Sequence, residues 1–288
     1  MSDDEEMTQG QDFAVLHGLS RSASSVFKVF SELKNRCKPS VLKGRTLPNE
    51  SIDDFLLRVA ISSTSGSSTL YRKAETANDA LALVWLALVK DRATSLCLNR
   101  DIAFPAAFTE KDLRDVTRLS QDPSTITKLP ELLAERYGII LVVEKYLPAM
   151  KLDGCVFKLI NGVPVIGISA RYNRYDNFWF TLSHELAHIV LHYESLDSPI
   201  VDDFDQASDS EVEVEANRLA TDSLIPRNVL RKIMLNQGSL KRVVELSNEA
   251  ECHPAIAAGM IRHRTGQWTL YSELVNFMDV RSELGLND

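Results

Sequence analysis

The strongest constraint on the fold lies in residues 180–193, FTLSHELAHIVLHY, where three residues separate two histidines. An α-helix turns by about 100° per residue, so His184 and His188 project from one face, one turn apart, and both imidazoles can reach a single metal ion. Apolar residues recur around the rest of the helix at the spacing of a buried stripe: Trp179, Leu182, Leu186, Ile189, Val190 and Tyr193. The segment is predicted to be a core helix that presents two potential metal ligands.

The residue after the first histidine is a glutamate. Glu185 lies about 100° around the helix from His184, so its carboxylate would stand beside the ion and could take a proton from water. This is the position of the general base in HExxH enzymes. The alternative interpretation is a chance match in a core helix whose histidines are only hydrogen-bonded, because a pattern with three fixed positions recurs by chance.

A catalytic zinc site needs a third protein ligand and one open position. His192 lies about 12 Å along the helix axis from His184, so we place it beside the metal rather than among the ligands. A second predicted helix, DSEVEVEANRLATDSLI, carries Glu211, Glu213 and Glu215. Its predicted buried stripe consists of Val212, Ala216, Leu219, Ala220 and Ser223. Glu213 and Glu215 flank this stripe on opposite sides at about 80°, so periodicity does not choose between them. The alternative is that all three glutamates are solvated charges on the helix and bind no metal.

Composition limits the class of protein. The chain has 288 residues, of which 44% are hydrophobic, enough for a sizeable core. The net charge of -8 argues against a chain that coats nucleic acid or an anionic membrane as a whole. The sequence contains no apolar run long enough to span a membrane, and its first residues are acidic where a signal peptide would be basic. These features predict a cytoplasmic protein without a membrane partner.

The cysteines are Cys37, Cys97, Cys155 and Cys252. They are scattered and form no CxxC pair, which fits neither a disulfide framework nor a structural zinc knuckle. Any metal site must therefore be built from other residues.

The chain divides by pattern into four parts: a disordered acidic tail at 1–11, a mainly helical region at 12–127, a mixed α/β region at 128–227 and a helical region at 228–288. The stretch from Lys28 to Arg45 holds six basic residues and one acid. It is either a solvated helix face or a contact for DNA or an acidic partner.

Strand patterns begin after LPELLAERYG, a predicted helix that ends at Gly138. IILVVEKYLP follows as a strand, and GCVFKLI and VPVIGIS form a predicted hairpin around Asn161-Gly162, a turn whose two positions both need positive φ. Pro164 cannot donate a backbone hydrogen bond, so we expect the second hairpin strand to lie, at least locally, at a sheet edge or bulge. An extended substrate could add to such an edge.

These segments resemble the ImmA/IrrE-type metallopeptidases of bacteria and their mobile elements. The resemblance runs from LPELLAERYGIILVVEKYLP through LDGCVFKLINGVPVIGISARYNRYDNFWFTLSHELAHIVLH to EVEANRLATDSLIP. It implies an α+β fold with a minimal zincin-like core, in which a small sheet with a hairpin packs with the HExxH helix and a glutamate-bearing helix, flanked by mainly helical regions. ECHPAIAAGMIRHRTGQW resembles the tail that follows this domain in members with an N-terminal helix-turn-helix.

The resemblance also implies an activity. The metal ligands of the family correspond to His184, His188 and Glu215, the last through the E-A-N element. The general base of the family corresponds to Glu185. The expected protein is a zinc endopeptidase that cleaves a helix-turn-helix repressor and thereby switches on genes of mobile-element transfer, stress response or phage defence. Tyr172, Tyr175 and His192 are candidate donors to the oxyanion of the tetrahedral intermediate.

Two further hypotheses follow. Cys155 begins the hairpin strand that, by resemblance, borders the metal groove, so its thiolate could occupy the open zinc position and keep the enzyme latent, with Cys97 as a weaker candidate. The alternative is that Cys155 is a buried residue that only packs in the protein interior. The alternative function is a non-catalytic or DNA-binding, antitoxin-like regulator that uses the zincin-like domain as a binding module. An intact Glu185 argues against a pure binding site.

Overall fold

The computed structural model describes residues 23–64, 77–105, 107–202 and 210–286. The acidic tail that we predict at 1–11 lies outside these residues. Two compact units emerge from the contacts, one within residues 1–88 and 147–150 and the other within 89–146 and 151–288. The second unit thus holds both the α/β region and the C-terminal helical region.

The first unit is helical in its described residues. It comprises a helix at 23–36, α2 (Pro39–Leu42), α3 (Ile52–Thr64) and the first part of α5 (Ala77–Arg100). Helix α3 buries side chains at helical spacing, among them Phe55, Leu56 and Val59. Within the basic stretch, Lys34 pairs with Asp53 at 2.5 Å.

The second unit confirms the predicted α+β class. Its longer helices are α6 (Glu110–Arg118), α7 (Leu129–Tyr137), α8 (Tyr175–His192), α9 (Glu211–Leu224), α10 (Arg227–Leu235), α11 (Leu240–Glu249) and α12 (Pro254–Thr265). Its short helices are α13 (Ser272–Val275), α14 (Val280–Glu283) and the 3-10 turns η1 (Leu119–Gln121), η2 (Pro123–Lys128) and η3 (Tyr193–Ser195). Its strands are β1 (Ile140–Val143), β2 (Gly154–Lys158), β3 (Pro164–Ile168) and β4 (Ile200–Asp202), in the order β1-β3-β2-β4.

The predicted hairpin is confirmed, because β2 and β3 pair antiparallel with Phe157 opposite Val165. Its turn differs from the prediction. Gly162 has a φ of 83° whereas Asn161 is not among the positive-φ residues, and the Gly162 amide donates to the Leu159 carbonyl at 2.8 Å. Only one turn position therefore uses the left-handed region, which glycine adopts at little cost.

Strand β3 as a whole is an inner strand, so the expectation of a sheet edge holds only locally, at Pro164, and is wrong for the rest of the strand. It lies between β2 and β1, and it pairs with β1 in parallel. Pro164 is its first residue, and β1 pairs only from Val165 onward, so the missing amide breaks no hydrogen bond to β1. Both sides of β3 are occupied, and an extended substrate cannot add there. The outer strands are β1 and β4.

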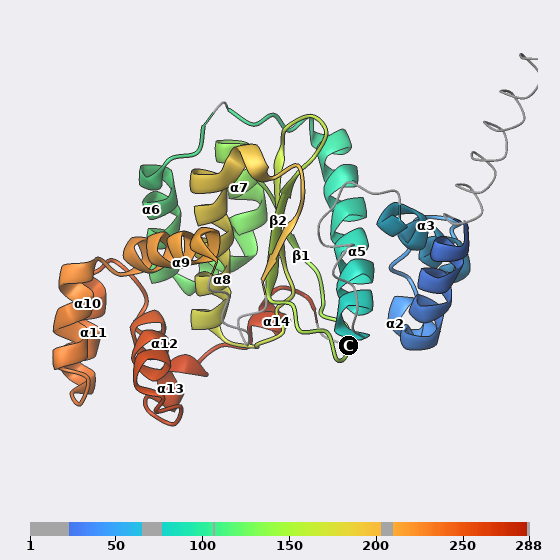
Figure 1. Cartoon of the computed structure of the whole chain (residues 1–288). Coiled ribbons are helices and arrows are strands. Elements are labelled where there is room, and N and C mark those ends of the chain that lie inside the picture. Colours follow the sequence, from blue (N-terminus) through green and yellow to red (C-terminus); the bar gives the residue numbers. More distant parts are fainter. Residues whose placement is uncertain (1–22, 65–76, 106, 203–209, 287–288) are drawn as a thin grey trace, which may run out of the picture. The chain divides into compact units, whose positions relative to one another are not determined.

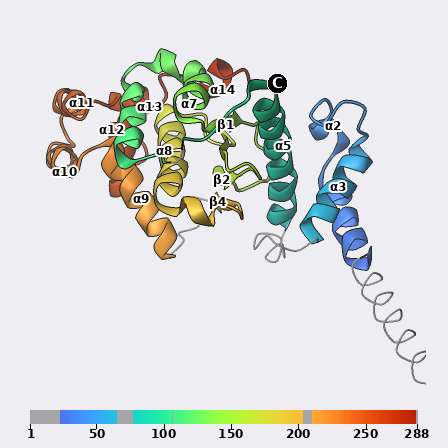
Figure 2. The ribbon, with the colours of Figure 1, turned by 90° about the horizontal axis from the view of Figure 1, so that it is seen from above.

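The sheet is covered on both faces in the second unit (Figures 1 and 2). Helix α8 covers one face, where Leu182 and Leu186 join Val156 and Ile166 in one hydrophobic core. Residues 89–100 of α5 cover the other face. Among the residues that the structure describes, no helix is both long and apolar enough to cross a membrane.

The C-terminal segment holds the start of α8 in place. Helix α12 packs so closely on α8 that a Cβ atom at Gly259 would lie 2.1 Å from Asp176 Oδ2. From α14, the Arg281 guanidinium donates to the Ala170 and Arg171 carbonyls, and its backbone amide donates to Asn173. The loop that enters α8 is thereby fixed from two sides.

Candidate metal centre

Helix α8 brings the two histidines of the HExxH pattern together. The Nε2 atoms of His184 and His188 lie 2.9 Å apart, and both side chains are fully buried. The predicted apolar stripe agrees with the structure at Trp179, Leu182 and Leu186, which are also fully buried. The core face of α8 fixes the helix, and its opposite face carries the two imidazoles.

The third side chain at this point is Glu213 of α9. Its Oε2 lies 3.1 Å from His184 Nε2, and its Oε1 lies 3.6 Å from His188 Nε2. A tetrahedral zinc ion with bonds of about 2.0–2.1 Å requires donor atoms roughly 3.3 Å apart. The two histidine nitrogens are 2.9 Å apart, and the distances from them to the two different Glu213 oxygens are 3.1 and 3.6 Å. These distances lie on either side of the required value, so the donor set has the size that zinc needs. Among the described residues, these three side chains form the group that could hold a metal ion.

The structure places Glu213, not the predicted Glu215, at the third position. Helix α9 buries Ala216, Ala220, Ser223 and Leu224, whereas Val212, which we assigned to the buried stripe, is 39% exposed. At 100° per residue, Glu213 lies about 35° from the centre of the observed stripe and Glu215 about 125° from it. The predicted stripe included Val212 and the half-buried Leu219 and left out the buried Leu224, which together turned it away from Glu213 and made the two glutamates look equivalent.

The electrostatics of the group favour an ionised carboxylate. Burial on its own would raise the pKa of Glu213, but hydrogen bonds from His184 and His188 outweigh it and hold the pKa well below its ordinary value. A carboxylate that stays ionised between two imidazoles is a suitable partner for a divalent cation.

Glu185 lies fully buried on α8 against the start of β2. A Cβ atom at Gly154 would stand 2.0 Å from Glu185 Oε1 and 2.9 Å from Thr181 Cγ2. Such distances are far below van der Waals contact, so any side chain at position 154 would displace the carboxylate. Because Gly154 has no side chain, the Glu185 carboxylate can occupy the space beside β2.

The residue before Gly154 is anchored. Asp153 accepts two hydrogen bonds of 2.9 Å from the Arg171 guanidinium, and the Asp153 side chain is 2% exposed. Two parallel N–H···O bonds fix both distance and orientation. The β2 backbone is therefore held rigidly where it faces Glu185.

We call the three potential metal ligands, His184, His188 and Glu213, the donor group. His192 and Glu215 lie next to it. His192 Nδ1 is 3.1 Å from His188 Nδ1, and His192 Nε2 is 3.4 Å from Glu215 Oε2. The placement of His192 beside the site, rather than in it, agrees with the helix-axis argument.

Of the other candidate oxyanion donors, Tyr175 is buried and donates to the Ser120 carbonyl, and the Tyr172 hydroxyl contacts the Arg171 guanidinium.

Cys155 is not positioned to bind the metal. Successive side chains of a strand point to opposite faces of the sheet. Gly154 faces Glu185 and Val156 packs in the core shared with α8, so the buried Cys155 side chain points to the other face. Cys97 on α5 instead accepts a hydrogen bond from Asn161 at 3.2 Å. The proposed cysteine ligand is therefore corrected to a packing residue.

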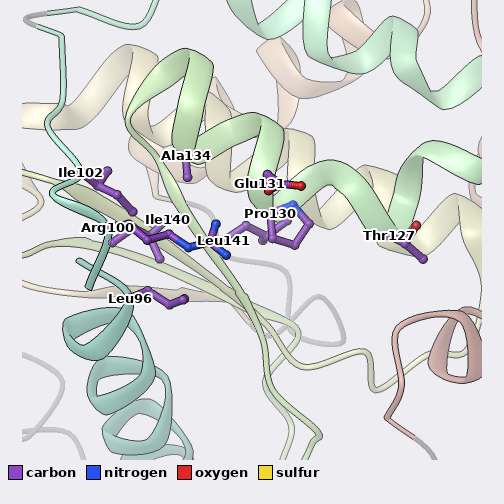
Figure 3. A pocket seen from close by; sticks show the side chains of 9 residues that line it. All are labelled: Leu96, Arg100, Ile102, Thr127, Pro130, Glu131, Ala134, Ile140 and Leu141. Atoms are coloured by element: carbon purple, nitrogen blue, oxygen red, sulfur yellow. The ribbon is translucent and has the colours of Figure 1, made fainter. Parts of the chain in front are cut away.

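A cavity of about 260 Å³ lies elsewhere in the second unit, between α5, α7 and β1 (Figure 3). Arg100, Glu131 and Ile140 are among its lining residues, and no member of the donor group is. Its volume is below that of pockets that enclose drug-sized ligands, and it does not mark the reactive site.

Periodicity left Glu213 and Glu215 as equal candidates for the third donor, and the family resemblance then favoured the wrong one; Gly154, which faces Glu185, was missed. A signal existed for each. The small residues Ala216 and Ala220 show which face of α9 can approach α8 closely, and Glu213 continues that face by one turn. A glycine at the first position of a strand often marks a close approach by another group.

Comparison with known proteins agrees with this geometry. Residues 123–257 match a peptidase family model, Peptidase_M78, described as the IrrE N-terminal-like domain. The matched segment spans the sheet, α8 and α9, and therefore all three donor residues. No curated protein and no solved structure gave a match.

Proposed function

Because residues 123–257 belong to the ImmA/IrrE-type peptidase family, we propose that this protein is a zinc-dependent endopeptidase that cleaves a helix-turn-helix transcriptional repressor. The observation that carries the catalytic part is the spacing of three donor atoms around one point, beside a buried glutamate in the general-base position. The identity of the substrate rests on the family resemblance.

The roles of the residues follow from their positions. His184, His188 and Glu213 would hold the zinc ion, which when bound polarises water and the scissile carbonyl. Glu185 accepts the proton of the attacking water and then delivers it to the leaving amine. Gly154 leaves the room that this carboxylate needs, and the Asp153–Arg171 pair holds the strand that borders it.

Repressor cleavage would make the protein a regulator of other genes, such as those of mobile elements, stress response or phage defence. A peptidase of this kind acts on few targets, so its natural assay is a defined protein rather than a mixture of peptides. The helix-turn-helix protein encoded beside it is the first candidate substrate.

The test compares wild type with Glu185→Gln and His188→Ala on that protein, with cleavage followed by mass spectrometry. Wild type should cleave at a defined bond. Glu185→Gln should keep its zinc and lose about 10²- to 10⁴-fold in rate, the usual contribution of a general base. His188→Ala should lose both zinc and activity.

Two results would argue against the proposal. Cleavage by Glu185→Gln at the wild-type rate would remove the general-base role. Zinc binding by a wild-type protein that cleaves none of the repressors tested would favour the alternative, a non-catalytic or DNA-binding regulator. In that case, salt-dependent DNA binding lost on neutralising Lys28, Lys38 and Lys43, which are exposed in the first unit, would support a nucleic-acid contact.

A further inference from the structure

His188 is contacted on both of its ring nitrogens. Its Nε2 faces His184 and Glu213 in the donor group, at 2.9 and 3.6 Å. Its Nδ1, on the far side of the ring, lies 3.1 Å from His192 Nδ1. His192 Nε2 in turn lies 3.4 Å from Glu215 Oε2. We call the series Glu215, His192 and His188 the outer network.

One arrangement of protons satisfies the outer network once a metal is bound. A neutral imidazole carries one N–H and one lone pair. His188 must direct its Nε2 lone pair at the metal, so its Nδ1 carries the proton and donates to His192 Nδ1. His192 Nδ1 is then the acceptor, so its own proton is on Nε2 and points to Glu215. Each ring thus fixes the tautomer of the next.

We propose that His192 and Glu215 are positioning residues that hold His188 in the tautomer and ring orientation for metal binding. This inference rests on the metal centre of the proposed function. Histidine ligands commonly donate their second N–H to a carboxylate or carbonyl, and removal of such partners weakens metal binding about 10- to 100-fold. Here the carboxylate reaches the ligand through a second imidazole.

The two contacts of the outer network, His188–His192 and His192–Glu215, differ in burial. The His192 side chain is 13% exposed and His188 is fully buried, so the bond between them is shielded from water. The Glu215 side chain is 55% exposed, so its bond to His192 is screened and weaker. His192 should therefore matter more than Glu215. The same geometry explains why helix α9 carries two glutamates two residues apart, one as a donor to the metal and one behind a ligand.

The test measures zinc affinity by chelator competition in four variants of the full chain. His192→Leu removes the acceptor while keeping much of the side-chain volume. His192→Asn keeps an acceptor, because the Asn amide oxygen stands at the position of the histidine Nδ1. Glu215→Ala removes the outer carboxylate. Glu211→Ala, an exposed glutamate at the start of the same helix, is the matched control.

We expect His192→Leu to bind zinc about 10- to 100-fold more weakly than wild type, with His192→Asn close to wild type. Glu215→Ala should show a smaller loss and Glu211→Ala none. Cobalt substitution gives a second readout, since the visible spectrum of bound Co²⁺ reports ligand geometry. It should change in His192→Leu and be restored in His192→Asn.

Equal affinity in wild type and His192→Leu would overturn the inference. An equal loss in His192→Leu and His192→Asn would also overturn it, because it would show that the ring packs rather than accepts a hydrogen bond. A wild-type protein that binds no zinc would be a failure of the proposed function instead, so the two failures are distinguishable.

Discussion

At the scale of single residues, Gly154 determines where the Glu185 carboxylate can lie. A Cβ atom at this position would stand 2.0 Å from Glu185 Oε1, so Gly154→Ala should push the carboxylate out of place. We expect zinc binding to persist while kcat falls by up to the 10²- to 10⁴-fold that a general base contributes. Overpacking should also lower stability by about 1–3 kcal/mol, which thermal unfolding measures.

Gly238→Ala is the matched control, because a Cβ atom there meets no atom within 4 Å. It should leave both kcat and stability near wild type. Full activity of Gly154→Ala would mean that the space beside β2 is not needed by Glu185.

Sequence reasoning at this scale found the residues that belong to one local pattern. His184, Glu185 and His188 lie on one helix, so their spacing alone gives their relative directions. The third donor could not be fixed in this way. Its place depends on which face of α9 packs against α8, and that contact joins segments separated by a loop. The assignment of Glu215 failed at this step.

At the scale of elements, α6 supports the two helices of the site from outside. It packs on α8 and α9 through Leu113 and Val116. Its first turn is closed by a reciprocal cap, in which Thr109 Oγ1 accepts from the Asp112 amide and the Asp112 carboxylate accepts from the Thr109 amide. Thr109→Ala should destabilise the protein by about 1 kcal/mol in chemical unfolding.

Thr94→Ala, the same change inside α5, is the control and should cost little, since alanine favours a helix interior.

The Thr109 hydroxyl, and then its amide, lower the pKa of Asp112 from its ordinary value of 3.8. The contribution of Asp112 is therefore complete above that value and is lost as the pH falls below it. The stability difference between wild type and Asp112→Ala should shrink in acid, and a constant difference would contradict the cap.

Elements with strong local signals were predicted well. Gly138 ends α7 in the left-handed conformation, and the hairpin forms around Gly162. The order of the strands was not predictable in the same way. Pro164 excludes a hydrogen bond at one residue, but the position of β3 in the sheet depends on its parallel pairing with β1, for which the sequence carries no short-range signal.

At the scale of the whole molecule, the C-terminal segment stabilises the loop that enters α8. Arg281 donates to two carbonyls of that loop, and its guanidinium lies 4.8 Å from the Tyr146 ring centre. Hydrogen bonds from a charged group contribute about 1.5–3 kcal/mol when they are buried. Because Arg281 is partly exposed, its bonds are screened, and Arg281→Ala should lower the unfolding free energy by roughly 2–3 kcal/mol, less than the sum of two buried bonds. Arg281→Lys should not restore it, because an ammonium lacks the fixed fork of donors.

Arg231→Ala, an exposed arginine of α10, is the control for lost charge and should change the unfolding free energy by less than about 0.5 kcal/mol. Equal effects of the two substitutions would show that the C-terminal contacts do not contribute to the stability of the site.

The central claim is that His184, His188 and Glu213 form one zinc site. The most direct measurement is the zinc content of purified wild type, Glu213→Ala and Glu215→Ala by elemental analysis after equilibrium dialysis against excess zinc, corrected for the free metal in the buffer. We predict stoichiometric zinc in wild type and in Glu215→Ala at saturating metal, and loss of zinc in Glu213→Ala. Zinc retained by Glu213→Ala but lost by Glu215→Ala would contradict the assignment, and wild type without zinc would contradict the metal centre itself.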